Sequence, residues 1–303
     1  MKKILITLVA IAVIGAVAYY FKPTGATPAA LPTDASLAEA LRTITINVSE
    51  FGGNQVTLVN GESPFPTGTG TSSVPGFVKM SDKRAIVFKG EDADIFTVMH
   101  INGGGSGTFQ FLTWFTYTGA TKTLAEKQRL ALGDRIMIND VAVNQTAPTE
   151  FDVLVSIKER RATEPMTTEP SQPRVLHFAH SSLGLTLRDV IFGTVAAPEI
   201  VVASPLPGST TPRSFTIAGA ARGPWYFEAN LPIEIRNATG TPILSVSATA
   251  QGEWMTTELV PFSTLIEIPN DVEAGLYTVV IRKDNPSGLP ENDASVEFPI
   301  LVQ

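Results

Sequence analysis

Tryptophan, arginine and glutamate side chains are concentrated in one stretch of this chain, within residues 219–262. The stretch contains Arg222, Trp225, Glu228, Glu253, Trp254 and Phe262. Indole rings and guanidinium groups stack on planar or ring-shaped ligands, and carboxylates pair with guanidinium groups, so these residue types suit a binding groove. The same residue types also fill and fasten the core of a β-sandwich. The structural interpretation is favoured, because aromatic residues on strands are usually buried.

A second candidate is the run Asp284-Asn-Pro-Ser-Gly-Leu-Pro-Glu291. Its prolines fix φ, its glycine permits positive φ, and Asn285 and Ser287 can bond to the neighbouring backbone. The run is either a rigid connection between strands or a recognition loop held on a rigid scaffold, with Glu291 at its end. The connecting role is favoured, because every residue type in the run has a role in turns.

Residues that could support catalysis or bind a metal are few. The chain has no cysteine and three histidines, of which His177 and His180 are three positions apart and would share one face of a helix. No third ligand follows at the spacing of a zinc site. The glycine-rich residues 103–107 lack the lysine of a phosphate-binding loop, and no Gly-x-Ser-x-Gly elbow exists. We therefore predict no catalytic residue, no metal site and no cofactor, and expect that the protein is not an enzyme.

The N-terminal segment indicates where the rest of the chain resides. Lys2 and Lys3 precede an uncharged run at residues 4–21. Residues 1–22 have the length of a short membrane anchor, and Ala16-Val17-Ala18 also fits the cleavage site of a signal peptide. Both interpretations stay open, and both place the remaining chain outside the cytoplasm. Residues 23–33 are Pro-rich and predict an extended linker.

Residues 34–180 predict a β-rich domain with one or two short helices. We expect a helix over residues 34–42, capped by Asp34 or Ser36, and a second over residues 124–130. Alternation of apolar and polar residues predicts strands from Thr43 onwards, while residues 62–76 read as loop. Residues 181–198 are expected to connect this domain to the next.

Residues 199–303 predict a β-sandwich. Short alternating runs, among them residues 225–228, are separated by Gly/Pro turns at the spacing of such domains. The fold class of the chain is therefore predicted to be all-β (mainly β), with a hydrophobic helix at the N-terminus. The hydrophobic fraction of 44% is sufficient for packed cores.

Several uncommon motifs follow one another in the C-terminal region. They are Ser204-Pro205, Ala221-Arg-Gly-Pro-Trp225, Phe227-Glu-Ala229, Gly252-Glu-Trp-Met-Thr256, Val260-Pro-Phe262 and the run from Asp284 to Glu291. With these motifs, residues 199–302 resemble the immunoglobulin-like domain of bacterial spore germination proteins. The resemblance implies a β-sandwich outside the membrane. It implies neither an activity nor a role in sporulation.

The middle region carries a weaker resemblance. Its motifs are Val56-Thr-Leu-Val-Asn-Gly61, Gly104-Gly-Ser-Gly-Thr-Phe109, Leu132-Gly-Asp-Arg-Ile136 and Glu164-Pro-Met-Thr-Thr168. In these motifs, residues 43–180 are similar to a bacterial extracytoplasmic module that recurs in anchored proteins of unknown function. This resemblance implies no activity.

Taken together, these patterns predict a cell-membrane protein, single-pass with its bulk extracytoplasmic, or a secreted protein if the N-terminal segment is cleaved. We expect a binding or structural role in the cell envelope, with loops of the immunoglobulin-like domain contacting peptidoglycan, a polysaccharide or another envelope protein. Two alternatives stay open, namely an enzyme or enzyme accessory acting on the cell wall, and a self-associating surface protein. The net charge of −7 argues against nucleic acid, which requires clustered basic residues.

Overall fold

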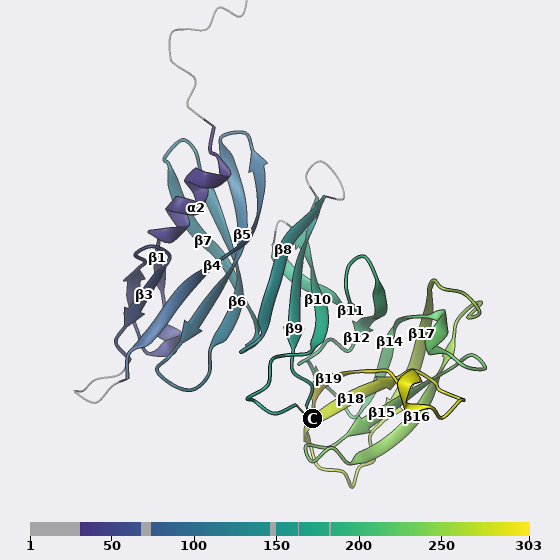
Figure 1. Cartoon of the computed structure of the whole chain (residues 1–303). Coiled ribbons are helices and arrows are strands. Elements are labelled where there is room, and N and C mark those ends of the chain that lie inside the picture. The colour runs from purple at the N-terminus through teal and green to yellow at the C-terminus, as the bar shows by residue number, and fades with distance from the viewer. Residues whose placement is uncertain (1–30, 68–73, 146–149, 163, 182) are drawn as a thin grey trace, which may run out of the picture.

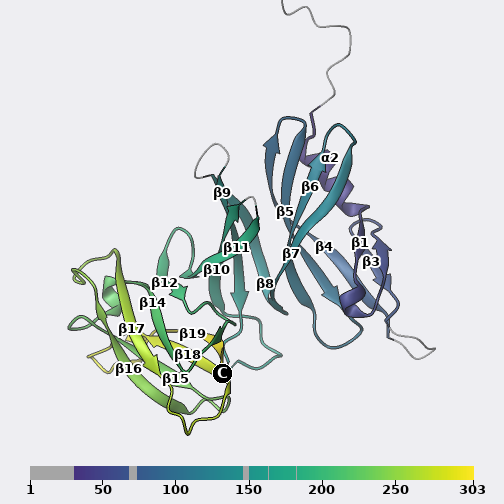
Figure 2. The same cartoon turned by 180° about the vertical axis from the view of Figure 1, so that it is seen from behind.

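In a computed structural model, the chain is described at residues 31–67, 74–145, 150–162, 164–181 and 183–303. These residues are mainly β-structure, as predicted. A five-stranded sheet lies at one end of the molecule and a sandwich at the other, with β8–β11 between them (Figure 1; Figure 2, from behind).

The chain begins with a small layer that covers the outer face of the five-stranded sheet. It contains α2 (Asp34–Arg42), β1 (Thr45–Asn47), the 3-10 turn η1 (Ser49–Phe51) and β2 (Gln55–Thr57). Thr33 caps α2, because its hydroxyl accepts from the Ser36 N–H and the Ser36 hydroxyl accepts from the Thr33 N–H. The capping residue is therefore Thr33 rather than Asp34 or Ser36. Leu37 and Leu41 are buried against the sheet.

The five-stranded sheet has the order β3-β4-β5-β6-β7. Its strands are β3 (Glu62–Phe65), β4 (Gly76–Lys89), β5 (Asp92–Asn102), β6 (Phe109–Thr118) and β7 (Thr123–Asp134). Side chains of β5 alternate between its two faces, so that Ile95 and Met99 pack under α2 while Phe96 and Val98 face the following strands. The sheet is thus the middle layer of three.

Two expectations for this region were wrong. Residues 124–130 form part of β7, which pairs with β6 along its length, and not a helix. Residues 62–65 form β3, where a loop was expected. Pro64 is accommodated because β3 is the outermost strand, and a proline without an N–H is tolerated at a sheet edge.

The remaining strands share one long hydrogen-bonded sheet. β8 (Met137–Gln145), β9 (Phe151–Glu159), β10 (Gln172–Ser181) and β11 (Gly184–Gly193) continue directly into β12 (Pro198–Ser204), β14 (Ser214–Arg222) and β17 (Leu259–Glu267). Residues 181–198, expected to be a connector, therefore contain a full strand of this sheet. One face of β8–β11 packs against the five-stranded sheet through side chains such as Val153, Val155 and Phe178.

The C-terminal sandwich uses the same face of the long sheet. Its second layer contains β15 (Asn230–Arg236), β16 (Pro242–Ala250), β18 (Gly275–Arg282) and β19 (Ser295–Val302), with β13 (Thr210–Thr211) beside β19. Two 3-10 turns, η2 (Gly223–Trp225) and η3 (Pro290–Asn292), lie in its connections. Its core side chains include Ile217, Phe262 and Val279, and belong to the same cluster as the core beneath the five-stranded sheet. The five-stranded sheet and this second layer thus lie side by side on one face of the long sheet, and β16 joins the second layer to it by pairing with β17.

The second layer of the sandwich meets β10 of the long sheet at Glu297 of β19. The Gln172 side chain both donates to the Glu297 carbonyl (2.9 Å) and accepts from its N–H (3.1 Å). The Arg174 guanidinium donates to the same carbonyl (2.6 Å), and the Glu297 carboxylate accepts from the Ala162 N–H (2.7 Å). All three of these side chains are buried. The outer edge of β19 is therefore covered by side chains of β10.

Across the described residues, no helix combines the length and the apolar character that a membrane crossing needs. The predicted hydrophobic helix and its flanking linker, up to residue 30, lie outside the described residues.

Candidate functional site

The 3-10 turn η2 is the centre of the sequence-predicted site. Trp225 is buried, and its indole N–H donates to Glu199 Oε2 (2.8 Å). Arg222 donates from Nε to the carbonyl of Pro198 (2.8 Å) rather than to a carboxylate. Residues 225–228, expected as a strand, therefore form the end of η2 and the turn after it. The side chains of Trp225 and Arg222 are both bonded to the start of β12.

The loop at residues 251–258 packs directly on η2. A Cβ atom at Gly223 would overlap the carbonyl oxygens of Trp254 and Thr256, so only glycine allows this approach. Trp254 is half-buried against the core, and Glu253 accepts from the N–H of Met255 within its own loop (2.9 Å). This geometry makes Trp254 a packing residue with one exposed edge.

The loop at residues 284–294 also meets η2, because the Asp284 N–H donates to the Trp225 carbonyl (3.0 Å). Within the loop, the Asn285 amide donates to the Leu289 carbonyl (2.8 Å), and the Ser287 hydroxyl donates to Asn285 Oδ1 (2.5 Å). The polar side chains at 285 and 287 therefore hold the loop in shape, and Glu291 is exposed on η3.

Glu228 lies apart from these contacts, at the tip of a two-residue turn. Phe227 and Asn230 pair across this turn, while Glu228 and Ala229 have φ values of 48° and 63°. Such a turn requires positive φ at both central positions. Phe262 lies on β17 and is buried in the core. The structure therefore gathers the residues around η2 but gives most of them packing roles.

The most accessible apolar side chains of this end are neighbours of the predicted residues. Phe227 is 39% exposed, Met255 is 75% exposed and Leu289 is 50% exposed. Each is carried by a segment that sequence reasoning singled out, and each segment is fastened to η2 or adjoins it. The sequence motifs thus build a rigid support for three exposed apolar side chains.

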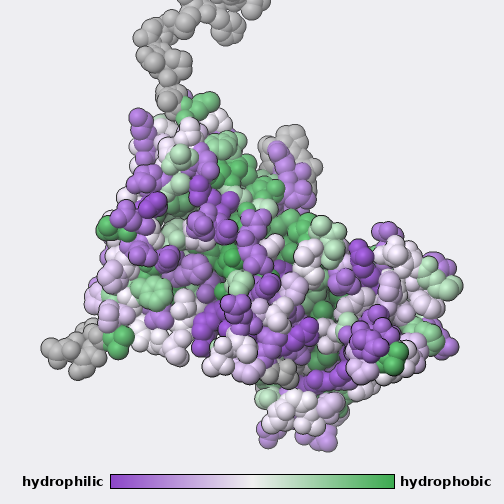
Figure 3. Space-filling view, in the orientation of Figure 1, coloured by the Kyte–Doolittle hydropathy of each residue, from purple (hydrophilic) through white to green (hydrophobic). Residues whose placement is uncertain are grey.

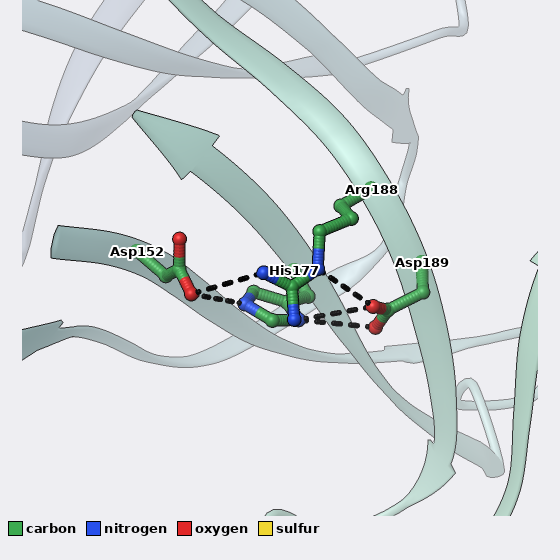
Figure 4. A network of polar contacts seen from close by, with 4 residues as sticks. All are labelled: Asp152, His177, Arg188 and Asp189. Carbon is green, nitrogen blue, oxygen red and sulfur yellow. Dashed lines mark hydrogen bonds and ion pairs between the residues drawn. The ribbon is translucent and has the colours of Figure 1, made fainter. Parts of the chain in front are cut away.

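A polar network that the sequence did not reveal lies on the opposite, outer face of the long sheet (Figure 4). His177 of β10 is held between two carboxylates, with Nε2 2.9 Å from Asp152 Oδ2 and Nδ1 3.1 Å from Asp189 Oδ1. Arg188 contacts both carboxylates, at 3.5 Å from Asp152 and 3.3 Å from Asp189. Because carboxylates engage both ring nitrogens, neither nitrogen is available to a substrate as a general base.

The two closely spaced histidines do not converge on a common ligand. They lie on a strand with a register shift between His177 and Phe178, rather than on a helix. His180 points into the sheet interface, where its ring stacks on Phe151 at 4.0 Å and meets the edge of Trp114 at 5.1 Å. Burial, opposed by nearby Asp94, lowers the pKa of His180. In the part of the chain that the structure describes, no cluster of three or more acidic or histidine side chains is arranged to hold a metal ion.

Comparison with known proteins bears on the C-terminal half of the chain. Residues 199–289 match the family model described as the immunoglobulin-like domain of bacterial spore germination (Gmad2). This region is an immunoglobulin-like domain of that family. No curated protein and no solved structure matches the chain. The resemblance of residues 43–180 to an extracytoplasmic module, and the domain boundaries drawn from the sequence, stay predictions.

The match begins at the strand where the immunoglobulin-like domain joins the rest of the molecule. Glu199, its first residue, lies on β12 and accepts the Trp225 indole N–H. β12 pairs on one side with β14 of the same domain and on the other with β11. Most of the site around η2 therefore lies within the matched residues, and the matched domain is not of a catalytic family.

A cleft of about 630 Å³ lies away from this domain, at the seam between β4 and β8. Ile86, Phe88 and Phe151 form apolar walls, and Lys89 lies over the Phe151 ring at 5.9 Å while pairing with buried Asp94. Hydrophobic side chains gather along this seam in Figure 3. Among the described residues that line the cleft, Lys89 is the one cation, and it is already paired.

Proposed function

We propose that this protein is an extracytoplasmic component of the bacterial cell envelope that binds a wall polymer or another envelope protein through the η2 end of its immunoglobulin-like domain. One observation carries the proposal. The segments around residues 223–230, 251–258 and 284–294 are fastened together at η2, and each presents an exposed apolar side chain. Residues held on a rigid scaffold but left exposed are the usual means of recognition.

A binding or structural role is supported better than catalysis. The family of residues 199–289 is not catalytic, and the His177 network has both imidazole nitrogens engaged. We also propose that residues 4–21 anchor the protein as a single membrane pass, as their length and flanking lysines indicate.

The binding proposal is tested by co-sedimentation of residues 31–303 with purified cell-wall sacculi. Met255→Ser and Leu289→Ser remove exposed side chains that make few internal contacts, so both variants should fold. Leu276→Ser and Leu265→Ser, at 59% and 56% exposure on β18 and β17, are matched controls away from η2. We expect the first pair to lose pelleting and the second pair to retain it.

Three results would redirect the proposal. If all four variants pellet like the parent, the η2 end is not the wall-binding surface. If the parent stays in the supernatant, the wall polymer is not the ligand, and cross-linking in intact cells with a photoreactive residue at Met255 then tests for a protein partner. Pelleting without sacculi would instead indicate self-association.

The anchor proposal has its own measurement. Cells that produce the full chain are fractionated, the membrane fraction is washed with alkaline carbonate, and the N-terminus of the recovered protein is sequenced. Retention in the membrane with Met1 or Lys2 at the N-terminus supports the anchor. A new N-terminus after Ala18, with the protein in the soluble fraction, would show cleavage instead.

A further inference from the structure

A groove of about 410 Å³ lies on the long sheet between the two layers that cover it. Apolar side chains of the long sheet, such as Leu176 and Val190, form its floor. One wall is residues 130–132 of β7, the last strand of the five-stranded sheet. The other wall comes from the immunoglobulin-like domain and includes Pro207 and Pro299. The groove is therefore formed jointly by both halves of the molecule.

The β7 wall is a free strand edge. Within the described residues, β6 is the only strand that pairs with β7. Alternate residues of an antiparallel edge strand turn their N–H and C=O groups away from the sheet, where another strand can bind. Residues 130–132 (Leu-Ala-Leu) carry no charged side chain. The register shift opposite Gln110 and Phe111 makes Leu132 a bulge residue, so the regular edge ends at Ala131. The facing prolines have no N–H to donate.

Gln128 of β7 pairs through its side chain with the edge of the neighbouring strand β11, as a peptide group would. Its Nε2 donates to the Leu185 carbonyl (3.0 Å), and its Oε1 accepts from the Leu185 N–H (2.8 Å). β12 pairs with β11 only from Val190 onwards, so the outer edge of β11 at Leu185 faces no strand among the described residues. The amide of Gln128 thus takes the position of a peptide group, two residues before the groove wall begins.

The polar groups at the groove favour an uncharged occupant that offers hydrogen-bond acceptors. Arg174 lines the groove, is paired with Glu159 and lies over the Phe192 ring at 4.9 Å, so its charge is already balanced. Its Nε has no partner among the described residues, although the side chain is buried. A peptide backbone supplies carbonyl acceptors and N–H donors without net charge. An acyl chain would offer the β7 edge neither hydrogen-bond acceptors nor hydrogen-bond donors.

We propose that the groove binds an extended, uncharged peptide segment of a partner polypeptide, which adds to β7 as a further strand. Its backbone pairs with β7 up to Ala131, and apolar side chains at alternate positions enter the floor of the groove. Because both halves of the molecule line the groove, the bound segment contacts both of them.

The test uses the full chain and a displayed library of random peptides. Binders are selected on the parent and counter-selected on Leu187→Trp, which enlarges a half-buried side chain that lines the groove on the same face as Phe178. Leu244→Trp, at a half-buried position of β16 outside the groove, is the matched control. Each selected peptide is then synthesised in two forms, one with a free backbone and one N-methylated at alternate residues. Lauric acid serves as a probe for acyl-chain binding.

We expect binders whose affinity falls at least about tenfold on Leu187→Trp, which fills the groove, and on N-methylation, which removes strand pairing. Their affinity should be unchanged on Leu244→Trp. Hydrogen exchange should slow at residues 130 and 131 when such a peptide is bound. The proposal fails if no selected peptide is sensitive to Leu187→Trp, or if N-methylated peptides bind equally well. It also fails if lauric acid binds while no peptide does, which would make the groove an acyl-chain site.

Discussion

At the scale of single residues, the immunoglobulin-like domain combines packed motif residues with local strain. Glu228 and Ala229 both have positive φ, although neither is glycine or asparagine. The left-handed conformation costs an L-residue roughly 1–2 kcal/mol. The turn at Phe227–Asn230 is therefore held against the preference of its own sequence by the pairing of β15 and β16.

Ala229→Gly relieves part of this strain. We expect the free energy of unfolding to rise by about 0.5–1 kcal/mol, because the glycine adopts positive φ without a clash and this gain exceeds the entropy it adds to the unfolded chain. Urea denaturation measures the change. The exposed Ala238→Gly, where φ is not positive, is the control and should lower stability by a similar amount. A loss of stability in Ala229→Gly would show that the turn is unstrained.

Tyr226 predicts a dependence of stability on alkaline pH. Its hydroxyl donates to the Val260 carbonyl (2.7 Å), and burial raises the pKa of Tyr226 from 10.0 to about 12. The folded state therefore keeps its proton while the unfolded chain loses it, so this contribution is complete below pH 10 and is lost as the pH rises toward 12.

We expect Tyr226→Phe to cost about 1 kcal/mol at neutral pH, because the Val260 carbonyl loses its donor. Above pH 10 the difference between parent and variant should shrink, since the variant has no proton to lose there. Guanidinium denaturation at a series of pH values gives this difference. A constant difference from pH 8 to pH 11.5 would contradict the assignment.

At the scale of elements, local sequence patterns identified most strands and the leading helix but failed where tertiary pairing decides. Residues 124–130 contain Leu, Ala, Glu, Lys and Gln, which favour helices in isolation, yet pairing with β6 makes them a strand. The His177 network was missed because its carboxylates come from strands on either side of β10. The signal in the sequence that could have indicated the network was a polar residue at an alternating position of each of these three strands.

The candidate binding residues show the same difference between what local sequence patterns predict and what tertiary contacts decide. The motifs around Trp225, Trp254 and Asn285 were sufficient to identify the immunoglobulin-like domain and to favour packing roles. Their convergence on η2 depends on contacts such as that of Gly223 with the 251–258 loop, and no spacing in the sequence encodes these contacts. Exposure of Met255 and Leu289 likewise follows from how the loops are folded.

Side chains that cover strand edges make a testable contribution at this scale. Gln172 satisfies both backbone groups of Glu297, and all of these atoms belong to buried residues. Gln172→Ala leaves the Glu297 N–H without its acceptor, and we expect a loss of about 2 kcal/mol of unfolding free energy. Chemical denaturation measures it, with the exposed Gln251→Ala as the control. A cost below that of the control would mean that water replaces the amide.

At the scale of the whole molecule, one long sheet supports both the five-stranded sheet and the second layer of the immunoglobulin-like domain. A single cluster of core side chains extends through both halves. Because the halves share strands and core, we expect residues 31–303 to unfold in one cooperative transition by calorimetry, with equal van't Hoff and calorimetric enthalpies. Two resolved transitions would show that the halves are independent despite the shared sheet.

The shared sheet also predicts what happens when the immunoglobulin-like domain is isolated. A fragment of residues 195–303 exposes the β12 edge that β11 covers, and it loses the contacts of Gln172 and Arg174 with Glu297. We expect the fragment to be less stable than the longer chain by at least about 2 kcal/mol and to associate through its uncovered edges. A fragment of residues 172–303 restores β10 and β11, and with them both sets of contacts. It should regain this stability in urea denaturation, while its own β10 edge, which β9 covers in the longer chain, still allows association. If the shorter fragment is equally stable and monomeric, the immunoglobulin-like domain is self-sufficient, and the junction at Glu297 serves only to set the angle between the two halves.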